Sequence, residues 1–432
     1  MTATDRTVRR RRPVLRAAVV TAAGAGLLAA LAPAAVAQPT GRPLASGCHG
    51  AVHLTPADRT DRPNSAEGRA DWAAADAALA GLTGPRYGTS ALAAVRENGR
   101  LVWRNATGVA DLATALPADP EGRFRIGSTT KTFVATTLLQ LVGERRLDLD
   151  DRLECLLPGI VPNSTGITVR QLLNHTSGVA DYTKDPAFEF SEQDWLTARR
   201  FKPYSLQDLV DIADKYPPAF PPGQDWRYSN TNYVLIGMII EKLTGRSWQE
   251  EVTRRIIRPL HLTGTSMPGN SPFIPGPHAH GYLKTDTGPV DVTLLNPSMA
   301  GPAGGAVSTT ADLTTFIGAL LDGRLLRPTE LAAMQQTSSF GAGRSYGLGL
   351  QRLDTPCGTF WGHAGGIPGY NTLMLGSADG KRQFASDITV YDVADVNAAN
   401  AAWNRLTVTA LCGAQAPAIA PGAVPDLARP AP

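Results

Sequence analysis

Lysine is scarce in this sequence, and no basic stripe with interleaved aromatic residues is present. The 432 residues include seven lysines and only 6% aromatic side chains, which excludes the pattern typical of nucleic-acid binding. The formal net charge is +3, but residues 1–37 contribute +5 from six arginines and one aspartate, which leaves −2 for the other 395. The basic balance therefore belongs to one short segment.

Beyond that segment a long hydrophobic run is also missing. The longest apolar run after residue 37 is about 233–240, too short for a membrane span. Before residue 37, an arginine-rich stretch ends at Arg16, an apolar stretch covers 17–31, and Ala35-Val36-Ala37 suits a cleavage site. The order predicts a signal peptide over 1–37 and a secreted protein, by either the general or the twin-arginine route.

Only four cysteines are present, and in an exported chain they favour disulfides. Cys357 precedes an apolar strand pattern and Cys412 ends the last helical pattern, so this pair could join the final helix to a sheet. Cys48 and Cys155 would then tie down the N-terminal arm. Four cysteines allow three pairings, so the second bridge is the less determined of the two.

Strand and helix patterns occupy different parts of the chain. Strand patterns lie near both ends, at 90–95, 101–106, 346–352, 359–363, 370–375 and 383–391. Helical patterns cover 70–82, 128–144, 169–174, 206–215, 230–243, 248–256, 310–321, 330–336 and 396–411. Glu97-Asn98-Gly99 between the first two strands predicts a β-hairpin. This layout predicts an α/β (α+β) fold whose sheet uses both ends of the chain, with a mostly helical part inserted.

Two proline-rich segments without periodicity flank the folded region. Residues 38–66 predict a flexible arm and residues 413–432 a disordered tail. The domain between them covers 67–412, with a sheet part at about 67–127 and 295–412 and a helical part at about 128–294.

Ser128-Thr129-Thr130-Lys131 at the head of a predicted helix is the sharpest chemical signal. Side chains at spacing i, i+3 project from one face, and a lysine of lowered pKa can take the proton of a serine nucleophile. The positive helix N-terminus suits an oxyanion. Of the seven lysines, Lys131 alone has a serine three residues before it. A helix cap followed by a surface lysine is the plain alternative.

Two further motifs contain polar residues that suit a catalytic site. Tyr228-Ser229-Asn230 precedes a predicted helix, and a tyrosine near a lysine can act as a phenolate-like base that later returns the proton. Asn230 can bond both a lysine and a substrate amide. His363, within Trp361-Gly362-His363-Ala364-Gly365-Gly366, could polarise a site that these glycines let a ligand approach. Taken alone, Tyr-Ser-Asn is more typical of a helix-capping loop, and a lone histidine is more often buried and hydrogen-bonded.

In this order the three motifs resemble those of the serine penicillin-recognising family, which includes β-lactamases and D-alanyl-D-alanine peptidases. The similar branch has Tyr-x-Asn and His-x-Gly and contains class C-like β-lactamases, secreted D-alanyl-D-alanine carboxypeptidases, D-aminopeptidases and some esterases. Segments 124–127, 172–178 and 346–350 also look like family blocks, and the likeness covers roughly 67–412. It implies an antiparallel sheet flanked by helices, with an inserted helical domain.

The resemblance also implies roles for individual residues. Ser128 becomes the acylated nucleophile, Lys131 its base partner and Tyr228 the proton shuttle. Asn230 orients the substrate amide, His363 takes the place of a cationic residue on the edge strand, and the N–H groups of Ser128 and Gly366 form the oxyanion hole. No metal or cofactor is expected. The secreted serine-type D-alanyl-D-alanine carboxypeptidases are the nearest branch, similar also in the positions of Cys357 and Cys412.

Two positions depart from that branch. Ala364 replaces a hydroxyl residue, and Gln351 replaces an arginine that helps hold the substrate's terminal carboxylate, while Arg352 should face the other side of its strand. Losing a charge-assisted bond to a carboxylate costs about 1.5–3 kcal/mol.

The leading expectation from the sequence is therefore an acyl-enzyme hydrolase. Its expected substrates are D-Ala-D-Ala-ended peptidoglycan peptides or related small acyl compounds, with β-lactams as inhibitors or substrates. A β-lactamase-like esterase or D-aminopeptidase is the enzymatic alternative, and a penicillin-binding sensor the non-enzymatic one.

Overall fold

The computed structural model describes residues 72–84, 87–162, 164–339, 345–390 and 396–419. The predicted signal peptide, the N-terminal arm with Cys48, and the tail beyond 419 lie outside these residues. Contacts divide the chain into units 1–57 and 58–432, and all of the described residues belong to the second unit. Within the described ranges, no helix combines the length and apolarity needed to cross a bilayer.

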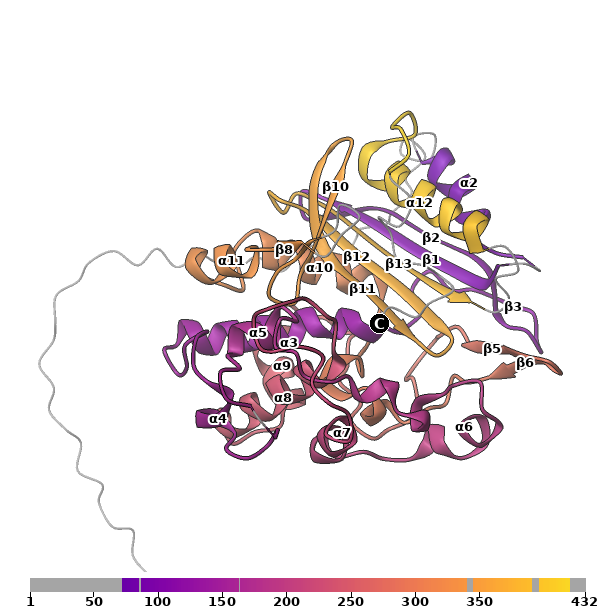
Figure 1. The fold of residues 1–432 in the computed structure, drawn as a ribbon. Helices are drawn as coiled ribbons and strands as arrows, with labels where there is room; N and C mark the ends of the chain where they lie inside the picture. The colour runs from indigo at the N-terminus through magenta and orange to yellow at the C-terminus, as the bar shows by residue number, and fades with distance from the viewer. Residues whose placement is uncertain (1–71, 85–86, 163, 340–344, 391–395, 420–432) are drawn as a thin grey trace, which may run out of the picture. The chain divides into compact units, whose positions relative to one another are not determined.

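A nine-stranded antiparallel sheet organises this unit (Figure 1). Its order is β3-β2-β1-β13-β12-β11-β10-β9-β8, and strands from the two ends of the chain meet where Ala94 of β1 lies opposite Ala385 of β13. The bounds are β1 Gly88–Glu97, β2 Arg100–Asp111, β3 Leu116–Pro117, β8 Ser338–Ser339, β9 Ser345–Tyr346, β10 Gln351–Thr355, β11 Gly358–Ile367, β12 Tyr370–Ser377 and β13 Arg382–Val390. The expected mixed fold with an antiparallel sheet is confirmed.

The first hairpin forms at the predicted turn. Asn98 and Gly99 have φ angles of 47° and 81°. Positive φ at both central residues is the geometry of a two-residue type I′ turn, which matches the twist of the strands and favours Asn-Gly. The local sequence therefore determines the connection between β1 and β2.

One face of the sheet is covered by α2 (Ala73–Ala80) and α12 (Val396–Cys412), which lie together over it in Figure 1. Trp103, Phe384 and Trp403 are buried in this layer. The expected disulfide joins Cys357, between β10 and β11, to Cys412, with 5.5 Å between the Cα atoms. Cys155 is exposed and unpaired among the residues described, and its proposed partner Cys48 lies outside them.

The other face packs against α10 and the helical part of the chain. The remaining α-helices are α3 Thr130–Gly143, α4 Leu153–Leu156, α5 Val169–Leu173, α6 Gln193–Thr197, α7 Leu206–Ala213, α8 Asn230–Thr244, α9 Trp248–Val252, α10 Thr310–Leu321 and α11 Pro328–Met334. Short 3-10 turns are η1 Gly127–Thr129, η2 Tyr182–Lys184, η3 Pro186–Phe188, η4 Arg199–Phe201, η6 Pro297–Met299 and η7 Gly301–Ala303, and η5 Thr253–Ile257 is a π-helix. Two small ladders pair β4 Phe124–Arg125 with β7 Val307–Ser308, and β5 Tyr282–Thr285 with β6 Gly288–Asp291.

Helix α3 is more deeply buried than its sequence indicates. The side chains of residues 130–139 are all buried, including the polar Thr130, Lys131 and Thr132. The predicted strand over 346–352 is also broken, since β9 ends at Tyr346 and β10 starts at Gln351. Between them Gly349 has φ +73°, and a Cβ there would lie 2.5 Å from the Cβ of Ala135 in α3. The chain leaves the sheet to pass against this helix.

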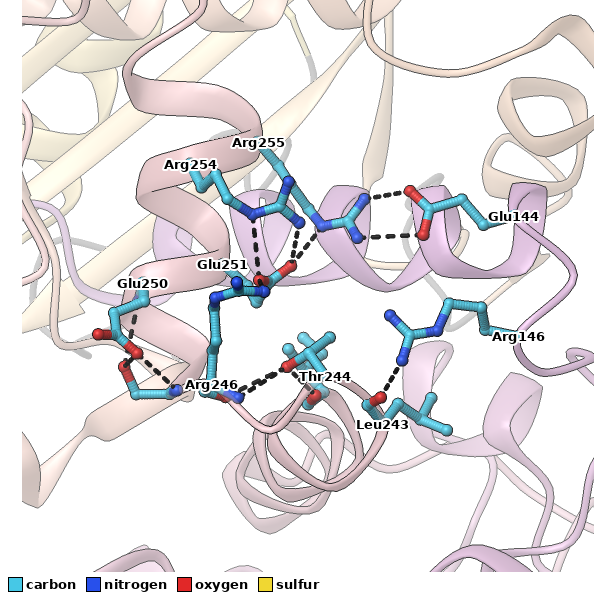
Figure 2. A network of polar contacts seen from close by, with 11 residues as sticks. Glu144, Arg146, Leu243, Thr244, Arg246, Glu250, Glu251, Arg254 and Arg255 are labelled. Atoms are coloured by element: carbon cyan, nitrogen blue, oxygen red, sulfur yellow. Dashed lines mark hydrogen bonds and ion pairs between the residues drawn. The ribbon is translucent and has the colours of Figure 1, made fainter. Parts of the chain in front are cut away.

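A network of charged side chains holds the C-terminal end of α3 (Figure 2). Glu251 of α9 is fully buried and accepts hydrogen bonds from Arg254, at 2.8 Å, and from Arg255. Arg255 also donates to both carboxylate oxygens of Glu144, the residue after α3. Arg246 approaches Glu251 at 3.7 Å. These ion pairs connect α3 to α9 and its π-helical extension.

Candidate active site

Ser128 lies in the turn η1, where the chain passes from β4 into α3. Two glycines let strand β11 approach this turn. Gly127 has φ +46°, and a Cβ there would lie 2.6 Å from the Gly366 carbonyl oxygen. A Cβ at Gly365 would lie 1.9 Å from the Ile126 carbonyl oxygen. Because neither approach tolerates a side chain, the glycines position the edge of β11 against Ser128.

Lys131, one turn into α3, is completely buried and contacts Ser128 directly. Its Nζ lies 2.9 Å from Ser128 Oγ, 2.8 Å from Asn230 Oδ1 and 2.6 Å from the Ala303 carbonyl oxygen. None of the three partners is a carboxylate. The i, i+3 spacing read from the sequence thus places the two side chains together, and α8 contributes the asparagine.

The surroundings of Lys131 favour its neutral form. Burial lowers the pKa of Lys131 well below 10.5, and the negative charge of Asp181 opposes this shift only in part. Asp181 does not touch the lysine. Its Oδ2 accepts a hydrogen bond at 3.1 Å from Nδ2 of Asn230, which lies between the two charges. Such an amine can accept a proton near neutral pH.

Tyr228 precedes α8 and lies beside both Lys131 and Ser128. Lys131 Nζ is 4.8 Å from the centre of its ring, which packs on the His175 imidazole with 4.2 Å between centroids. Burial raises the pKa of Tyr228 well above 10, and the nearby Ser128 hydroxyl lowers it in part. The phenol oxygen is buried without a hydrogen bond of normal geometry among the described residues. A protonated phenol fits a proton donor, and the phenolate-like base expected from the sequence stays a prediction.

His363 is completely buried on β11. Its Nδ1 faces the Ala364 carbonyl oxygen, which can only accept, so Nδ1 carries a proton and donates it there, while Nε2 lies 2.8 Å from Tyr346 Oη. Burial, with the charge of Lys131 as a second cause, lowers the pKa of His363 to about 3. Burial therefore disfavours a positive charge on His363, and its expected place at the family's cationic position stays a prediction.

A cavity of about 180 Å³ opens at Ser128. Asn230 and Gly366 border it, whereas the ring of His363 lies elsewhere. Ser128 and Gly366 thus both border the cavity, as the two residues of an oxyanion hole must. Their role as its N–H donors stays a prediction. The full lining consists of Ser128, Tyr182, Thr183, Phe188, Phe190, Asn230, Met299, Ala300, Ala303, Gly304, Gly366, Ile367 and Pro368.

Several of these lining residues were missed by sequence reasoning. Tyr182, Phe188 and Phe190 come from the turns η2 and η3 and the segment after them, and Met299 comes from η6. Asp181, which bonds Asn230, was missed as well. The only available signal was the concentration of aromatic residues in 182–190, which has no helical or strand period.

The described lining of the cavity contains neither arginine nor lysine. Gln351 Oε1 accepts a hydrogen bond from the Ala364 N–H at 3.3 Å, which uses this side chain to hold β11. Arg352 lies 3.0 Å from Asp354 on the same strand, and its side chain is 41% exposed. A substrate carboxylate therefore meets no cation at either position.

Comparisons with known proteins agree with this geometry. A family model described as Beta-lactamase matches residues 74–389. Penicillin-binding protein 4* of Bacillus subtilis is 29% identical over 66% of this chain and 65% of that protein, so the chain spans just under two thirds of that relative. A D-stereospecific amidohydrolase from Streptomyces sp. is 39% identical with a TM-score of 0.71, covering 79% of this chain and 99% of that one. A D-amino acid amidase from Ochrobactrum anthropi is 28% identical with a TM-score of 0.65, covering 74% and 93%.

Proposed function

The chain belongs to the β-lactamase family, and we propose that it is a serine hydrolase that cleaves the amide bond following a D-amino acid with an apolar or aromatic side chain. The observation that carries the proposal is the lining of the cavity at Ser128, which is aromatic and aliphatic and holds no cation among its described residues. Two solved neighbours, one named a D-stereospecific amidohydrolase and the other a D-amino acid amidase, support the stereochemistry.

Lys131 fits the role of the base because its three contacts suit both protonation states. A neutral amine has two N–H donors and one lone pair. With the donors on Asn230 Oδ1 and the Ala303 carbonyl, at 2.8 and 2.6 Å, the lone pair is left for the Ser128 hydroxyl at 2.9 Å. Proton transfer from Ser128 reverses one hydrogen bond and leaves the other two unchanged.

In the acylation step, Ser128 Oγ attacks the amide carbon while its proton passes to Lys131 Nζ. The oxyanion forms in the cavity beside the peptide N–H groups of Ser128 and Gly366. When the C–N bond breaks, the leaving nitrogen takes a proton through the Tyr228 phenol, which burial keeps protonated. Water then hydrolyses the ester, which releases the D-amino acid and restores the serine.

The acyl side chain is bound by the aromatic wall of the cavity. Phe188 lies at the end of η3 and Phe190 two residues later, and both line the cavity with Met299 and Ile367. Burying a phenyl ring on such a surface is worth about 1.5–3 kcal/mol, or roughly 10- to 100-fold in kcat/KM. The wall therefore favours D-phenylalanine or D-leucine over D-alanine.

A D-alanyl-D-alanine carboxypeptidase, acting on peptidoglycan peptides and acylated by β-lactams, is the second candidate. The family relative named Penicillin-binding protein 4* favours it, together with the Ser128, Lys131 and Tyr228 arrangement. The missing cation for a terminal carboxylate counts against it. A penicillin-binding sensor that is acylated without turnover is the non-enzymatic alternative; since it too needs Lys131 to activate Ser128, turnover after acylation separates it from an enzyme. In either case we propose that residues 1–37 direct export.

A paired substrate assay tests the proposal. The amides of D- and L-phenylalanine are compared with a D-Ala-D-Ala-ended peptide as free acid and as amide. We expect D-phenylalanine amide to be the best substrate, at least about 100-fold better than its L enantiomer. Fastest turnover of the free-acid peptide would instead establish the carboxypeptidase, and equal turnover of both enantiomers would reject both candidates.

Phe188→Ala tests the wall itself. It should raise KM for D-phenylalanine amide by roughly 10-fold and leave D-alanine amide almost unchanged, because the smaller acyl group makes no ring contact. Phe201→Ala is the matched control, since Phe201 is 41% exposed and lies outside the cavity lining. Equal loss on both substrates would mean that Phe188 has only a structural role.

A further inference from the structure

Asp181 is a buried carboxylate that bonds two different groups. It is 5% exposed and precedes the turn η2. Its Oδ1 accepts the N–H of Thr183 at 3.1 Å, which is an ordinary N-terminal cap. Its Oδ2 accepts a hydrogen bond from Asn230 Nδ2, also at 3.1 Å. Capping accounts for the first oxygen and leaves the second to be explained.

The second contact determines which way the Asn230 amide points. In the observed orientation Oδ1 faces the Lys131 amine and Nδ2 faces the Asp181 carboxylate. A flipped amide would put its NH₂ group against the lysine donors and its oxygen against a carboxylate, and both contacts would be lost. Buried polar groups left in this way cost about 1–3 kcal/mol each, so the two partners together hold a single orientation.

We propose that Asp181 is a positioning residue for catalysis, which locks the Asn230 amide so that Oδ1 holds Lys131 and the second N–H of Nδ2 remains available to the acyl substrate. Asn230 borders the cavity together with Ser128, so that N–H can reach the carbonyl or amide of the bound acyl group. The inference rests on the acyl-enzyme function proposed above and adds to it a residue outside the cavity lining.

Asp181 also tunes the base through its charge. It opposes the effect of burial on the pKa of Lys131. Its own pKa is raised by burial, against the bonds from Thr183 and Asn230 and the charge of Lys131. The other titratable groups close to these two are His175 and His363, whose pKa burial lowers, and the phenols Tyr182, Tyr228 and Tyr233, whose pKa burial raises. Removing the Asp181 charge therefore makes Lys131 lose its proton at lower pH.

Asp181→Asn tests the lock with almost no change in shape. Asparagine is an equally good cap, so its single oxygen can still bond Thr183. Its NH₂ group then faces Asn230 Nδ2, which favours the flipped amide. Since misplacement of a catalytic group by about 1 Å costs on the order of 100-fold, we expect kcat/KM for the best amide substrate to fall about 100-fold, mostly in kcat. The acid limb of the pH profile should move to lower pH.

Asp185→Asn is the matched control. Asp185 caps the next turn through the Ala187 N–H at 2.9 Å and accepts a bond from Tyr216 at 3.1 Å, and unlike Asp181 it is only half-buried and lies 3.5 Å from Lys215. It is thus a second capping carboxylate of the same region that does not contact Asn230. It should keep wild-type turnover and pH profile. Asp181→Ser, which retains a capping oxygen but no second acceptor, should repeat the loss seen in Asp181→Asn and covers the case in which that variant does not fold.

Failure of this inference is distinct from failure of the proposed function. If the wild-type chain hydrolyses an acyl substrate but both Asp181 variants stay within about 3-fold of Asp185→Asn, with an unmoved acid limb, the lock is rejected and the function stands. If the wild-type chain forms no acyl-enzyme with any amide, ester or β-lactam, the function is rejected first.

Discussion

The two ends of helix α3 bury charge in opposite ways. At the N-terminal end Lys131 is completely buried with three neutral partners, and the nearest carboxylate lies beyond Asn230. At the C-terminal end the buried charge is Glu251, which directly contacts the guanidinium groups of Arg254 and Arg255 (Figure 2). Among the described residues, the Lys131 amine thus has no carboxylate in direct contact. The Glu251 carboxylate, in contrast, contacts more than one guanidinium group.

The difference separates a reactive site from a structural one. Arginine stays protonated in proteins and binds carboxylates with two N–H groups, so the network at Glu251 can only hold helices together. A buried lysine without a carboxylate contact has a lowered pKa and can exchange a proton. Burying a lysine in this way costs stability. The ion-pair network at the opposite end of the same helix makes that part of the structure rigid and offsets the cost.

Lys131→Met gives the largest expected effect. Removing the base should lower kcat for D-phenylalanine amide by at least about 10⁴-fold, as for other members of catalytic sets. The same change removes a buried amine with no carboxylate contact, so thermal stability should stay constant or rise. Steady-state kinetics and a thermal melt check both parts. Residual activity within 10-fold of wild type would contradict the assignment of the base.

Glu251→Gln should do the reverse. The substitution leaves the guanidinium groups of Arg246, Arg254 and Arg255 around a buried neutral amide. Breaking a buried ion pair costs about 3–5 kcal/mol. Denaturant unfolding should therefore show a clear loss in the free energy of unfolding, while kcat at low temperature remains near wild type. Loss of activity without loss of stability would mean that the two ends of α3 are not separable.

The pH dependence of the free energy of unfolding also distinguishes the active site from the Glu251 network, because His363 at the active site titrates. His363 has a folded-state pKa of about 3 against an ordinary value of 6.5, so below 6.5 the unfolded chain binds a proton that the folded chain does not. Its contribution to stability is present above pH 6.5 and falls by about 1.4 kcal/mol per pH unit as pH drops toward 3.

The matched variant for that titration is His363→Gln, which removes the ionisable ring. The difference in unfolding free energy between wild type and variant should shrink steadily from pH 6.5 to pH 4.5. Over this range Glu251 stays ionised, because its arginine partners outweigh burial and lower its pKa below 4.5. A difference that is flat with pH would show that His363 is protonated in the folded protein.

Arg246→Ala should have the smallest effect. Arg246 lies at the rim of the network, 3.7 Å from Glu251 with a side chain that is 58% exposed. Water screens such a pair, so the expected loss is below about 1 kcal/mol and should decrease further in high salt. A loss of unfolding free energy comparable to that of Glu251→Gln would mean that the exposed Arg246 contributes as much to the network as the buried Glu251.

Local patterns in the sequence predict the parts of the molecule that depend on neighbouring residues. The Asn98-Gly99 turn follows from the positive φ angles that only a few residue types adopt easily. The contact of Ser128 with Lys131 follows from helical spacing, since residues three apart share a face. The Cys357–Cys412 bridge was one of three pairings that the sequence allowed, and it was favoured by the strand and helix patterns at the two cysteines and by the family likeness.

Features that depend on the packing of distant segments were not predictable in this way. Asp181 and Asn230 are separated by 49 residues without any shared period. The aromatic wall comes from short turns, and the break at Gly349 depends on how closely the chain passes α3. The charge of His363 depends on complete burial, which no local pattern around a single histidine reports.

The central claim is that Ser128 is acylated with Lys131 as its base. Intact-mass spectrometry after acid quenching, on samples mixed with D-phenylalanine methyl ester or with benzylpenicillin, tests it most directly. We predict one covalent adduct that maps to the peptide containing Ser128, is absent in Ser128→Ala, and accumulates far more slowly in Lys131→Met. An adduct that persists in Ser128→Ala, or that forms at the wild-type rate in Lys131→Met, would contradict it.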